Sequence, residues 1–255
     1  MGSFLQRIFG RSLASVAPVP DLAALEVDMH SHLLPGLDDG AEALEQSVEL
    51  VRAMQELGYR KLVMTPHVMG DFYKNTPAAI QAALVGLREA VAIAGITDIE
   101  LACAAEYYLD EWFVQKLENG EELLSFGGAK RYVLIETSYI NEPFNFQEII
   151  FQLKSAGYQP VLAHPERYTF LYDNFPALEK MRANDILLQV NLNSLAGYYS
   201  RGAKRVAEKL IDAGLVDLLG TDAHNLKHTA TLREKVLSAE YLRKALALPL
   251  LNSSL

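Results

Sequence analysis

The stretch that best predicts the fold reads Asp28-Met29-His30-Ser31-His32 and continues as Leu33-Leu34-Pro35-Gly36-Leu37-Asp38-Asp39-Gly40. The apolar residues around its start predict a strand, and strand side chains alternate between two faces, so His30 and His32 point to the same face. Two imidazoles on one face at the end of a strand form half of a metal site.

Similar polar residues follow short apolar runs at four other places in the chain. These places read Thr65-Pro66-His67, Ala104-Ala105-Glu106, Ala163-His164-Pro165 and Gly220-Thr221-Asp222-Ala223-His224. Five of the six histidines therefore come directly after a short apolar run. This repetition predicts that several strands contribute ligands to one site.

From Glu26 onward, short apolar runs alternate with longer segments of helical period, which is typical of repeated βα units. The predicted strands cover residues 26–30, 61–65, 99–105, 131–136, 159–163, 186–191 and 215–220. The predicted helices cover residues 42–57, 77–94, 110–117, 145–156, 174–183, 201–213 and 230–246.

Periodicity alone does not distinguish an open parallel sheet from a closed barrel. The candidate ligands decide in favour of a barrel, because they follow at least five different strands, and the carboxyl ends of barrel strands meet at one mouth. We therefore expect an α/β fold, a TIM-like barrel of about seven βα units in a single domain. The predicted division is an N-terminal arm over residues 1–20 and a barrel over residues 21–255.

Composition excludes several classes of protein. The formal net charge of −9 argues against a non-specific nucleic-acid binder, because such binding depends on clustered Lys and Arg. The single cysteine, Cys103, excludes an internal disulfide, and Leu109 stands where a cysteine phosphatase of the Cys-x5-Arg type needs arginine. No stretch has the length of a transmembrane helix, so we expect a cytoplasmic protein.

The donor types predict a catalytic metal centre. Imidazole and carboxylate are ligands of Zn, Mn and Fe, and thiolate ligands of a structural zinc site are absent. The candidate ligands are His30, His32, Asp39, His67, Glu106, His164, Asp222 and His224. Eight are too many for one tetrahedral ion, so we expect two or three divalent metals, with Glu106 able to bridge two. Such a centre suits phosphate ester hydrolysis, and Arg167 can hold a phosphate oxygen.

These motifs, in this order, resemble the PHP (polymerase and histidinol phosphatase) metallo-phosphoesterases, and more closely their bacterial tyrosine-phosphatase branch of the CpsB/YwqE type. The resemblance runs from about Val27 to Lys227 and includes His164-Pro165-Glu166-Arg167-Tyr168 and Asp222-Ala223-His224-Asn225. It implies a distorted (β/α)7 barrel of PHP type with three metals, often manganese, although Fe and Zn are alternatives. It also implies that the eight candidates are the ligands and that Arg167 binds phosphate.

The implied substrate is a phosphotyrosyl protein, namely a bacterial tyrosine autokinase that controls capsule or exopolysaccharide export. Such a partner would hold the enzyme near the inner membrane. One departure from the branch matters: a second arginine can follow the Asp-x-His motif, and this chain has Asn225-Leu226-Lys227-His228-Thr229 there. Lys227, His228 or Arg233 could replace it. The oligomeric state carries no signal in the sequence.

Several residues near these motifs have open roles at this stage. Asp39 matches the ligand pattern, whereas Asp38 can shape the turn before Gly40. Glu166 either orients a ligand or lies on an exposed loop. Tyr73 could stack on an aryl group of the substrate, and Tyr198 and Tyr199 could line the mouth.

The predicted reaction is in-line attack on phosphorus by a metal-bridging hydroxide, with Arg167 stabilising the phosphate oxygens. A phenolate leaves with a pKa near ~10, so it needs less acid assistance than an alkoxide, although His224 or His228 could donate a proton. Two alternatives are a small-molecule phosphatase of the histidinol phosphatase kind and a non-catalytic, metal-stabilised regulator of a kinase. A 3′ exonuclease is disfavoured by the negative charge.

Overall fold

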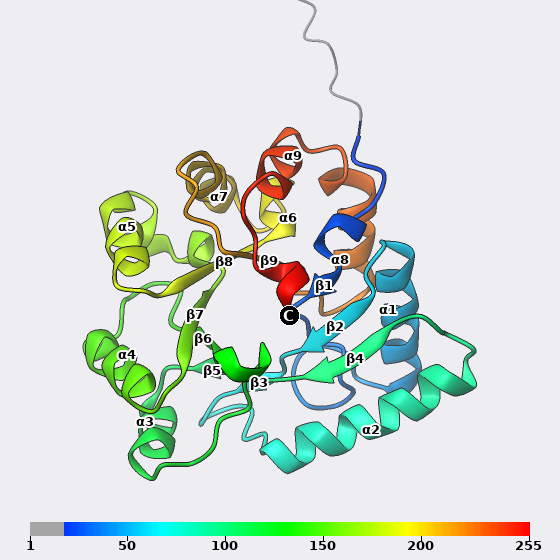
Figure 1. Ribbon diagram of the computed structural model, residues 1–255, viewed down its shortest axis with the longest axis horizontal. Helices are drawn as coiled ribbons and strands as arrows, with labels where there is room; N and C mark the ends of the chain where they lie inside the picture. Colours follow the sequence, from blue (N-terminus) through cyan, green and yellow to red (C-terminus); the bar gives the residue numbers. More distant parts are fainter. Residues whose placement is uncertain (1–17) are drawn as a thin grey trace, which may run out of the picture.

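Parallel strands follow one another around a barrel in the computed structural model of the protein, which describes residues 18–255 (Figure 1). The strands are β1 (Val27–Asp28), β2 (Lys61–Met64), β3 (His67–Val68), β4 (Glu100–Cys103), β5 (Glu106–Tyr108), β6 (Tyr132–Glu136), β7 (Gln159–Ala163), β8 (Leu187–Asn191) and β9 (Leu218–Gly220). They form a three-stranded sheet of order β1-β2-β4 and a six-stranded sheet of order β3-β5-β6-β7-β8-β9.

All seven predicted strands occur, and two further segments, β3 and β5, lie just beyond the second and third predicted strands. Thr65 and Pro66 interrupt the chain between β2 and β3, and Ala104 and Ala105 interrupt it between β4 and β5. Proline has no N–H to donate to a neighbouring strand, which explains the first interruption. The barrel is thus distorted, and the prediction of seven βα units is confirmed.

The barrel closes between its first and last strands. Ser31 and Ala223 form a parallel bridge, the His32 N–H donates to the Ala223 carbonyl at 2.9 Å, and the Asp222 N–H donates to the His30 carbonyl at 2.8 Å. These bonds lie just beyond β1 and β9. The closure therefore joins the two motifs that carry most of the candidate ligands.

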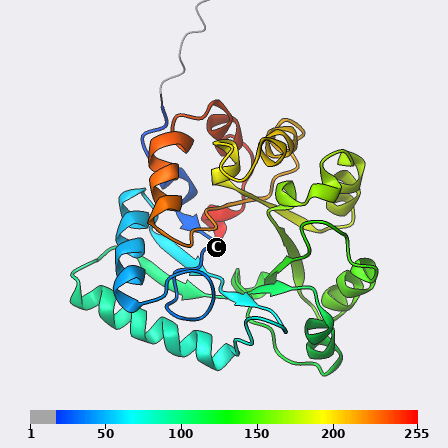
Figure 2. The same ribbon diagram turned by 180° about the vertical axis from the view of Figure 1, so that it is seen from behind.

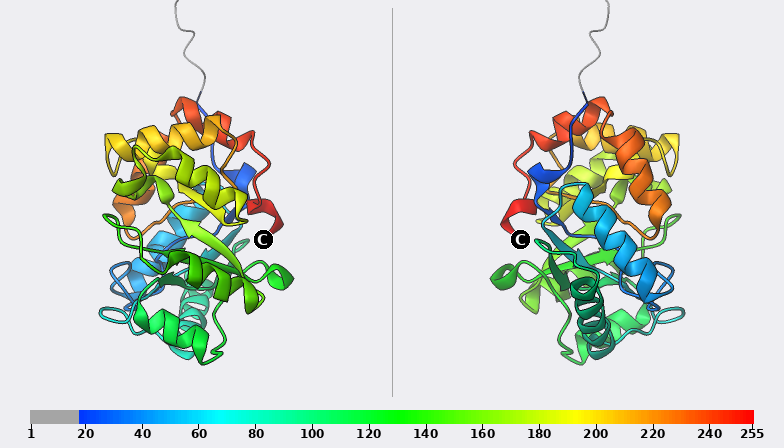
Figure 3. Two further views of the ribbon diagram at one scale, coloured as in Figure 1. Left: turned by 90° about the vertical axis from the view of Figure 1, so that its left-hand side faces the viewer. Right: turned by 90° about the vertical axis from the view of Figure 1, so that its right-hand side faces the viewer.

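Helices surround the barrel on its outer side (Figures 1 and 3). They are α1 (Leu44–Glu56), α2 (Pro77–Ile93), α3 (Glu111–Glu118), α4 (Phe146–Ser155), α5 (Phe175–Ala183), α6 (Leu192–Leu195), α7 (Arg201–Asp212), α8 (Leu226–Thr231) and α9 (Glu240–Leu246). Short 3₁₀ segments cover Ala23–Leu25, Gly128–Lys130, Pro165–Arg167, Thr169–Leu171 and Asn252–Ser254. Six predicted helices are confirmed within two residues at each end, whereas α6 was not predicted.

The predicted helix over residues 230–246 is wrong as a single element. The Asn225 side chain accepts hydrogen bonds from the N–H groups of Lys227 and His228, and this cap starts α8 at Leu226. The chain then forms a π-helical turn over Leu232–Val236, becomes extended at Ala239, and starts α9 at Glu240.

Neighbouring side chains on one strand enter two different apolar clusters. On β2, Leu62 and Met64 pack with the helices, whereas Val63 joins Val27, Met29 and the other members of an inner cluster. This alternation is what strand geometry dictates when both faces of the sheet are covered.

The chain ends against the barrel itself, since Leu251 and Leu255 pack on the inner cluster and the C terminus lies over the centre of the barrel (Figure 1). Residues 1–17 of the predicted arm lie outside the described residues, and the boundary at residue 21 stays a prediction. Among residues 18–255, no helix has both the length and the apolar character needed to cross a membrane.

Candidate metal centre

The carboxyl ends of the strands bring all eight predicted ligands to one end of the barrel, shown in Figure 2 with the loop between β1 and α1 in front. His30 and His32 follow β1, and Asp39 lies in that loop. His67 and Glu106 stand at the starts of β3 and β5. The others, at the ends of β7 and β9, are His164, Asp222 and His224.

Glu106 is the centre of the cluster. Its Oε2 lies 3.2 Å from His30 Nε2, 3.4 Å from His32 Nε2 and 3.2 Å from His67 Nδ1. Its Oε1 lies 3.2 Å from His164 Nε2. The side chain is completely buried, and neither oxygen has a hydrogen-bond partner among residues 18–255. A buried carboxylate surrounded by ring nitrogens fits a metal centre.

Groups of donor atoms that all lie within 4.8 Å of one another could each hold an ion. Four such groups occur in the described residues: His32, Asp39, His67 and His224; His30, His164 and Asp222; His30, His32 and Glu106; and His67, Glu106 and Glu136. Neutral imidazole and ionised carboxylate are both electron-pair donors, so these facing groups fit divalent metals.

Positive charge beside the carboxylates of the cluster keeps them ionised: protonated imidazoles supply it in the protein alone, and divalent cations would supply it where the imidazoles act as neutral donors. Burial opposes ionisation of Glu106, but the adjacent His30 and His67 outweigh it and hold the pKa of Glu106 well below its usual range. Burial likewise opposes ionisation of Asp222, and His30 and His224 hold the pKa of Asp222 well below its usual range. Both side chains are therefore anionic near neutral pH, as donors to a cation need to be.

Glu136 is a member of the cluster that the sequence analysis missed. Its Oε1 lies 3.0 Å from His67 Nδ1, and its Oε2 lies 3.9 Å from His164 Nε2. It ends β6 after an apolar run, so it follows the same pattern as the predicted ligands. That pattern was the signal that could have identified it.

Asp38 and Asp39 have different surroundings. Asp38 Oδ2 lies 2.8 Å from His32 Nδ1 and accepts from the His67 N–H at 2.9 Å, and Asp38 Oδ1 accepts from the Gly40 N–H at 3.0 Å. Asp39 Oδ1 instead lies 3.6 Å from His67 Nε2 and 3.5 Å from His224 Nε2. Asp38 thus orients His32, while Asp39 faces the possible metal donors.

Two side-chain amides on one face of β8 orient further members of the cluster, His30 and Asp222, in the same way. Gln189 Oε1 lies 2.8 Å from His30 Nδ1, and Gln189 Nε2 donates to Asn191 Oδ1 at 2.9 Å. Asn191 Nδ2 then donates to Asp222 Oδ2 at 2.7 Å. Neither amide was predicted. Such partners set the ring orientation and basicity of metal ligands.

Glu166 lies behind this chain of bonds. It is fully buried, accepts from the Asn191 N–H at 2.9 Å and from Ser194 Oγ at 2.7 Å, and burial raises its pKa to about 7. The alternative of an exposed loop residue is therefore wrong. Glu166 holds the end of β8, and it acts on the cluster through Asn191.

Two of the predicted ligands adopt an unusual backbone. His164 has φ of 34° and Asp222 has φ of 50°, in the left-handed region that residues with a Cβ rarely occupy. Backbone strain of this kind is found at functional sites, where the surrounding structure holds it in place.

Arg167 lies at the edge of the cluster. Its Nη1 donates to Asp222 Oδ2 at 2.7 Å, and its guanidinium lies 4.8 Å from the ring of Tyr139 and 4.1 Å from the ring of Tyr199. All four line an open pocket of about 390 Å³ with His164, His224 and His228 among the other walls. The arginine is thus held between two rings beside the metal donors.

Of the remaining predicted residues, Tyr198, Tyr199 and His228 line this pocket, whereas Tyr73 and Lys227 do not. Tyr73 stacks on His67 with the ring centroids 5.7 Å apart. Burial and the neighbouring His224 lower the pKa of His228 to about 4, so His228 is neutral at pH 7. Lys227 is exposed, with Nζ 5.6 Å from the centre of the Tyr198 ring.

Arg233 does not replace an arginine after the Asp-x-His motif. Its Nη2 pairs with Glu56 Oε2 at 2.7 Å, on the outer surface of the barrel. Of the three candidates for that role, His228 lines the pocket around Arg167.

Comparison with known proteins agrees with this geometry. The family model described as capsular polysaccharide synthesis, CpsB/CapC, matches residues 26–246. The tyrosine-protein phosphatase YwqE of Bacillus subtilis strain 168 is 32% identical over 201 residues, which cover 79% of this chain and 78% of YwqE. The tyrosine-protein phosphatase CpsB of Streptococcus pneumoniae is 27% identical over 205 residues, which cover 78% of this chain and 83% of CpsB.

A solved structure is similar over most of the chain. It comes from the crystal structures of YwqE from B. subtilis and CpsB from S. pneumoniae, described as unique metal-dependent tyrosine phosphatases. The TM-score is 0.73 at 30% sequence identity, and the match covers 87% of this chain and 93% of that one. The family predicted from the motifs is confirmed: this chain belongs to the CpsB/CapC family of capsular polysaccharide synthesis.

Proposed function

We propose that this protein is a metal-dependent tyrosine-protein phosphatase of the CpsB/YwqE type that acts in capsular polysaccharide synthesis. The observation that carries this proposal is the position of Arg167, which lies in the same pocket as the buried histidines and carboxylates. A phosphate group bound there would meet both an arginine and the metal donors.

Two or three divalent cations, Mn²⁺ in the first place and Fe or Zn as alternatives, would be held by the eight predicted ligands together with Glu136. Bound cations would lower the pKa of water at the centre and neutralise charge on the phosphate oxygens. The ring nitrogens and carboxylates of the chain hold the positions at which that charge is needed.

Arg167 would bind the phosphate group of the substrate. One of its terminal nitrogens is held by Asp222, and its guanidinium carbon lies over the rings of Tyr139 and Tyr199. Its other N–H groups would bind an incoming anion, because a planar guanidinium matches two phosphate oxygens at once. Charge that develops on those oxygens during the reaction is stabilised without rearrangement of the site.

His228 would assist the departing phenolate. Its ring lies 5.5 Å from that of His224 and lines the same pocket as Arg167. Since its pKa is lowered to about 4, it acts as a neutral hydrogen-bond donor at pH 7. A phenolate needs no stronger acid, because its own pKa is about 10. His224 Nε2 faces Asp39 instead, which fits its place among the ligands.

Two aromatic side chains would enclose the aryl group of phosphotyrosine. Tyr73 stacks on His67, and Tyr139 stacks on His164 with the ring centroids 5.9 Å apart. They lie on the loops after β3 and β6, on different walls of the site. Aromatic rings prefer offset stacked contacts, so these walls favour an aryl phosphate over an alkyl phosphate.

The physiological substrate would be a bacterial tyrosine kinase that controls capsule export. That partner would bring the enzyme to the inner membrane.

Hydrolysis of a phosphotyrosyl peptide, a phosphoseryl peptide and histidinol phosphate tests the function directly. Each substrate is assayed with Mn²⁺, with a chelator, and with His32→Ala as a control. We expect metal-dependent hydrolysis with a preference for phosphotyrosine. Hydrolysis of histidinol phosphate alone would indicate a small-molecule phosphatase, and a metal-loaded but inactive protein would indicate a regulator.

A further inference from the structure

A second pocket lies next to the metal centre and is not used by the chemistry described above. It has a volume of about 480 Å³, within the ~300–1,000 Å³ typical of ligand sites. Asp39, His224 and Asn225 belong to its wall and also to the wall of the pocket that holds Arg167. The two pockets therefore adjoin at these three residues.

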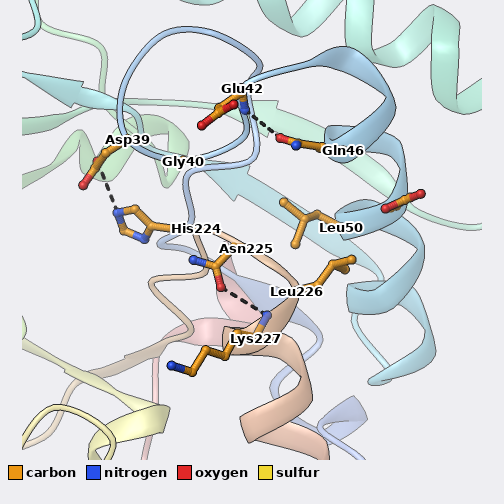
Figure 4. A pocket seen from close by; sticks show the side chains of 10 residues that line it. Asp39, Gly40, Glu42, Gln46, Leu50, His224, Asn225, Leu226 and Lys227 are labelled. Atoms are coloured by element: carbon orange, nitrogen blue, oxygen red, sulfur yellow. Dashed lines mark hydrogen bonds and ion pairs between the residues drawn. The ribbon is translucent and has the colours of Figure 1, made fainter.

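The second pocket lies between the start of α1 and the start of α8 (Figure 4). Glu42 and Gln46 lie on one side, Asn225 and Lys227 lie on the other, and Asp39 and His224 mark the end that meets the metal centre. Leu50 supplies a buried apolar floor, and Leu226 is half-exposed beside it. The pocket thus combines an apolar floor with a polar rim.

The electrostatic character of the rim is set by two glutamates. Glu42 and Glu49 both line the pocket and are exposed, and neither carboxylate takes part in an ion pair within residues 18–255. Lys227 is the one lysine or arginine in this lining, and its Nζ is directed at the Tyr198 ring at 5.6 Å. The walls of the pocket therefore present uncompensated negative charge to an occupant.

We propose that this pocket is a peptide subsite that accepts a lysine or arginine side chain close to the phosphotyrosine of the substrate protein. The inference rests on the proposed function. A phosphotyrosine that enters the Arg167 pocket carries peptide backbone on both sides, so a neighbouring residue reaches past the wall of Asp39 and His224. The stem of that residue packs on Leu50 and Leu226, and its cationic end meets Glu42 and Glu49.

Peptides that differ at one position test this subsite. Lysine, glutamine or glutamate is placed in turn at each of the two positions before and after phosphotyrosine, and kcat/KM is measured for each peptide. We expect lysine to exceed glutamine by about fivefold at one position or more, since exposed charge pairs contribute ~0.2–1 kcal/mol each. The gain should shrink as salt is raised from 50 mM to roughly 500 mM, because exposed charges are screened.

Variants of the two glutamates, Glu42 just before α1 and Glu49 within it, test where the effect arises. In Glu42→Gln/Glu49→Gln, the ratio of kcat/KM for the lysine peptide to that for the glutamine peptide should fall to about one. Glu45→Gln removes one negative charge, against two in the double variant, from an exposed residue of α1 outside the pocket, and it should keep the wild-type ratio. Equal loss in both variants would indicate a long-range field and overturn the subsite.

Other outcomes also decide the question. A preference for glutamate would show that Lys227 dominates the pocket, and no preference among the peptides would show that the pocket is not a peptide subsite. Phenyl phosphate, which lacks flanking residues, separates the two proposals: absent hydrolysis of phenyl phosphate and of every peptide would overturn the phosphatase itself, whereas hydrolysis without a lysine preference overturns the subsite alone.

Discussion

The two ends of the barrel are built from the same strands but hold opposite kinds of side chain. At the end where the strands begin, apolar residues fill the interior, and the C-terminal segment covers them. At the other end, imidazoles and carboxylates are buried against one another. The side views place the C terminus and the loop between β1 and α1 at opposite ends (Figure 3).

The polar groups of the two ends have different partners. We call the end covered by the C-terminal segment the closed end, and the end that holds the imidazoles and carboxylates the open end. At the closed end, Asn252 Nδ2 donates to the carbonyls of Val27 at 3.0 Å and Leu219 at 2.7 Å, and its Oδ1 accepts from the Leu219 N–H at 3.0 Å. At the open end, both oxygens of Glu106 lack a hydrogen-bond partner among residues 18–255. The polar groups of Asn252 are therefore satisfied within the protein, whereas the buried carboxylate at the open end is placed to bind a cation.

Removal of metal should produce the largest effect and should act on the open end alone. We expect chelation to lower kcat/KM for a phosphotyrosyl peptide by at least about a thousandfold, or roughly 4 kcal/mol, because the charge stabilisation at the centre is lost. We also expect a lower Tm, since the buried donors bind cations only in the folded state.

Metal analysis alongside the kinetic assay checks this prediction, and addition of Mn²⁺ should restore activity. Unchanged activity in protein shown to be free of metal would mean that the buried histidines and carboxylates are not a metal centre.

Replacement of Arg167 should separate phosphate binding from metal binding. Arg167→Ala is expected to reduce kcat/KM by about a hundredfold or more. A loss of this size is found in enzymes when a group that stabilises transition-state charge is removed. Arg167→Lys should recover little, since an ammonium group cannot match the planar stacking between Tyr139 and Tyr199.

The bound metal of both Arg167 variants is measured at the same time. A full complement of metal with low activity supports a phosphate-binding role. Loss of metal would show instead that Arg167 chiefly supports Asp222, to which it donates at 2.7 Å.

Asn252→Ala should affect the closed end without changing the chemistry. The substitution leaves the Val27 carbonyl and the Leu219 N–H and carbonyl without their partner, so we expect the free energy of unfolding to fall by about 2–3 kcal/mol. Urea unfolding checks this, with Ser253→Ala at an exposed neighbouring position as the matched control.

The folded Asn252→Ala protein should keep its kcat/KM for a phosphotyrosyl peptide. A proportionate loss of activity at temperatures where it is fully folded would mean that the two ends are coupled, which contradicts the division between them.

The smallest effect concerns the orientation of a ligand. Asp38→Asn keeps the shape of the side chain but removes one of the acceptors that hold His32 Nδ1 and the His67 N–H. We expect metal affinity or kcat/KM to fall by about tenfold, in the range found for groups that orient metal ligands. The control is Asp71→Asn, which changes an exposed residue of the loop after β3 and should behave like wild type. If the two variants bind metal with equal affinity, Asp38 does not orient a metal ligand.

The sequence alone was sufficient for the pattern of βα units and for the eight predicted ligands that meet at one end, although it missed Glu136 among them. The His-x-His and Asp-x-His motifs each follow an apolar run, and that local pattern survives in the structure. It was not sufficient for the segment after His224, because the cap formed by Asn225 overrides the apolar periodicity of residues 230–246. It also missed Gln189 and Asn191, since amides within a strand carry no signature of a metal site.

The sequence by itself determined the end of the barrel at which the chemistry occurs, because the carboxyl ends of parallel strands share one edge and the polar residues come at those ends. Only the tertiary structure decided which side chains orient one another. His30 meets Gln189 across 159 residues, and Arg167 meets Asp222 across 55 residues. The reason is physical: these contacts depend on how the barrel closes and on the register between distant strands, and neither is encoded in local periodicity.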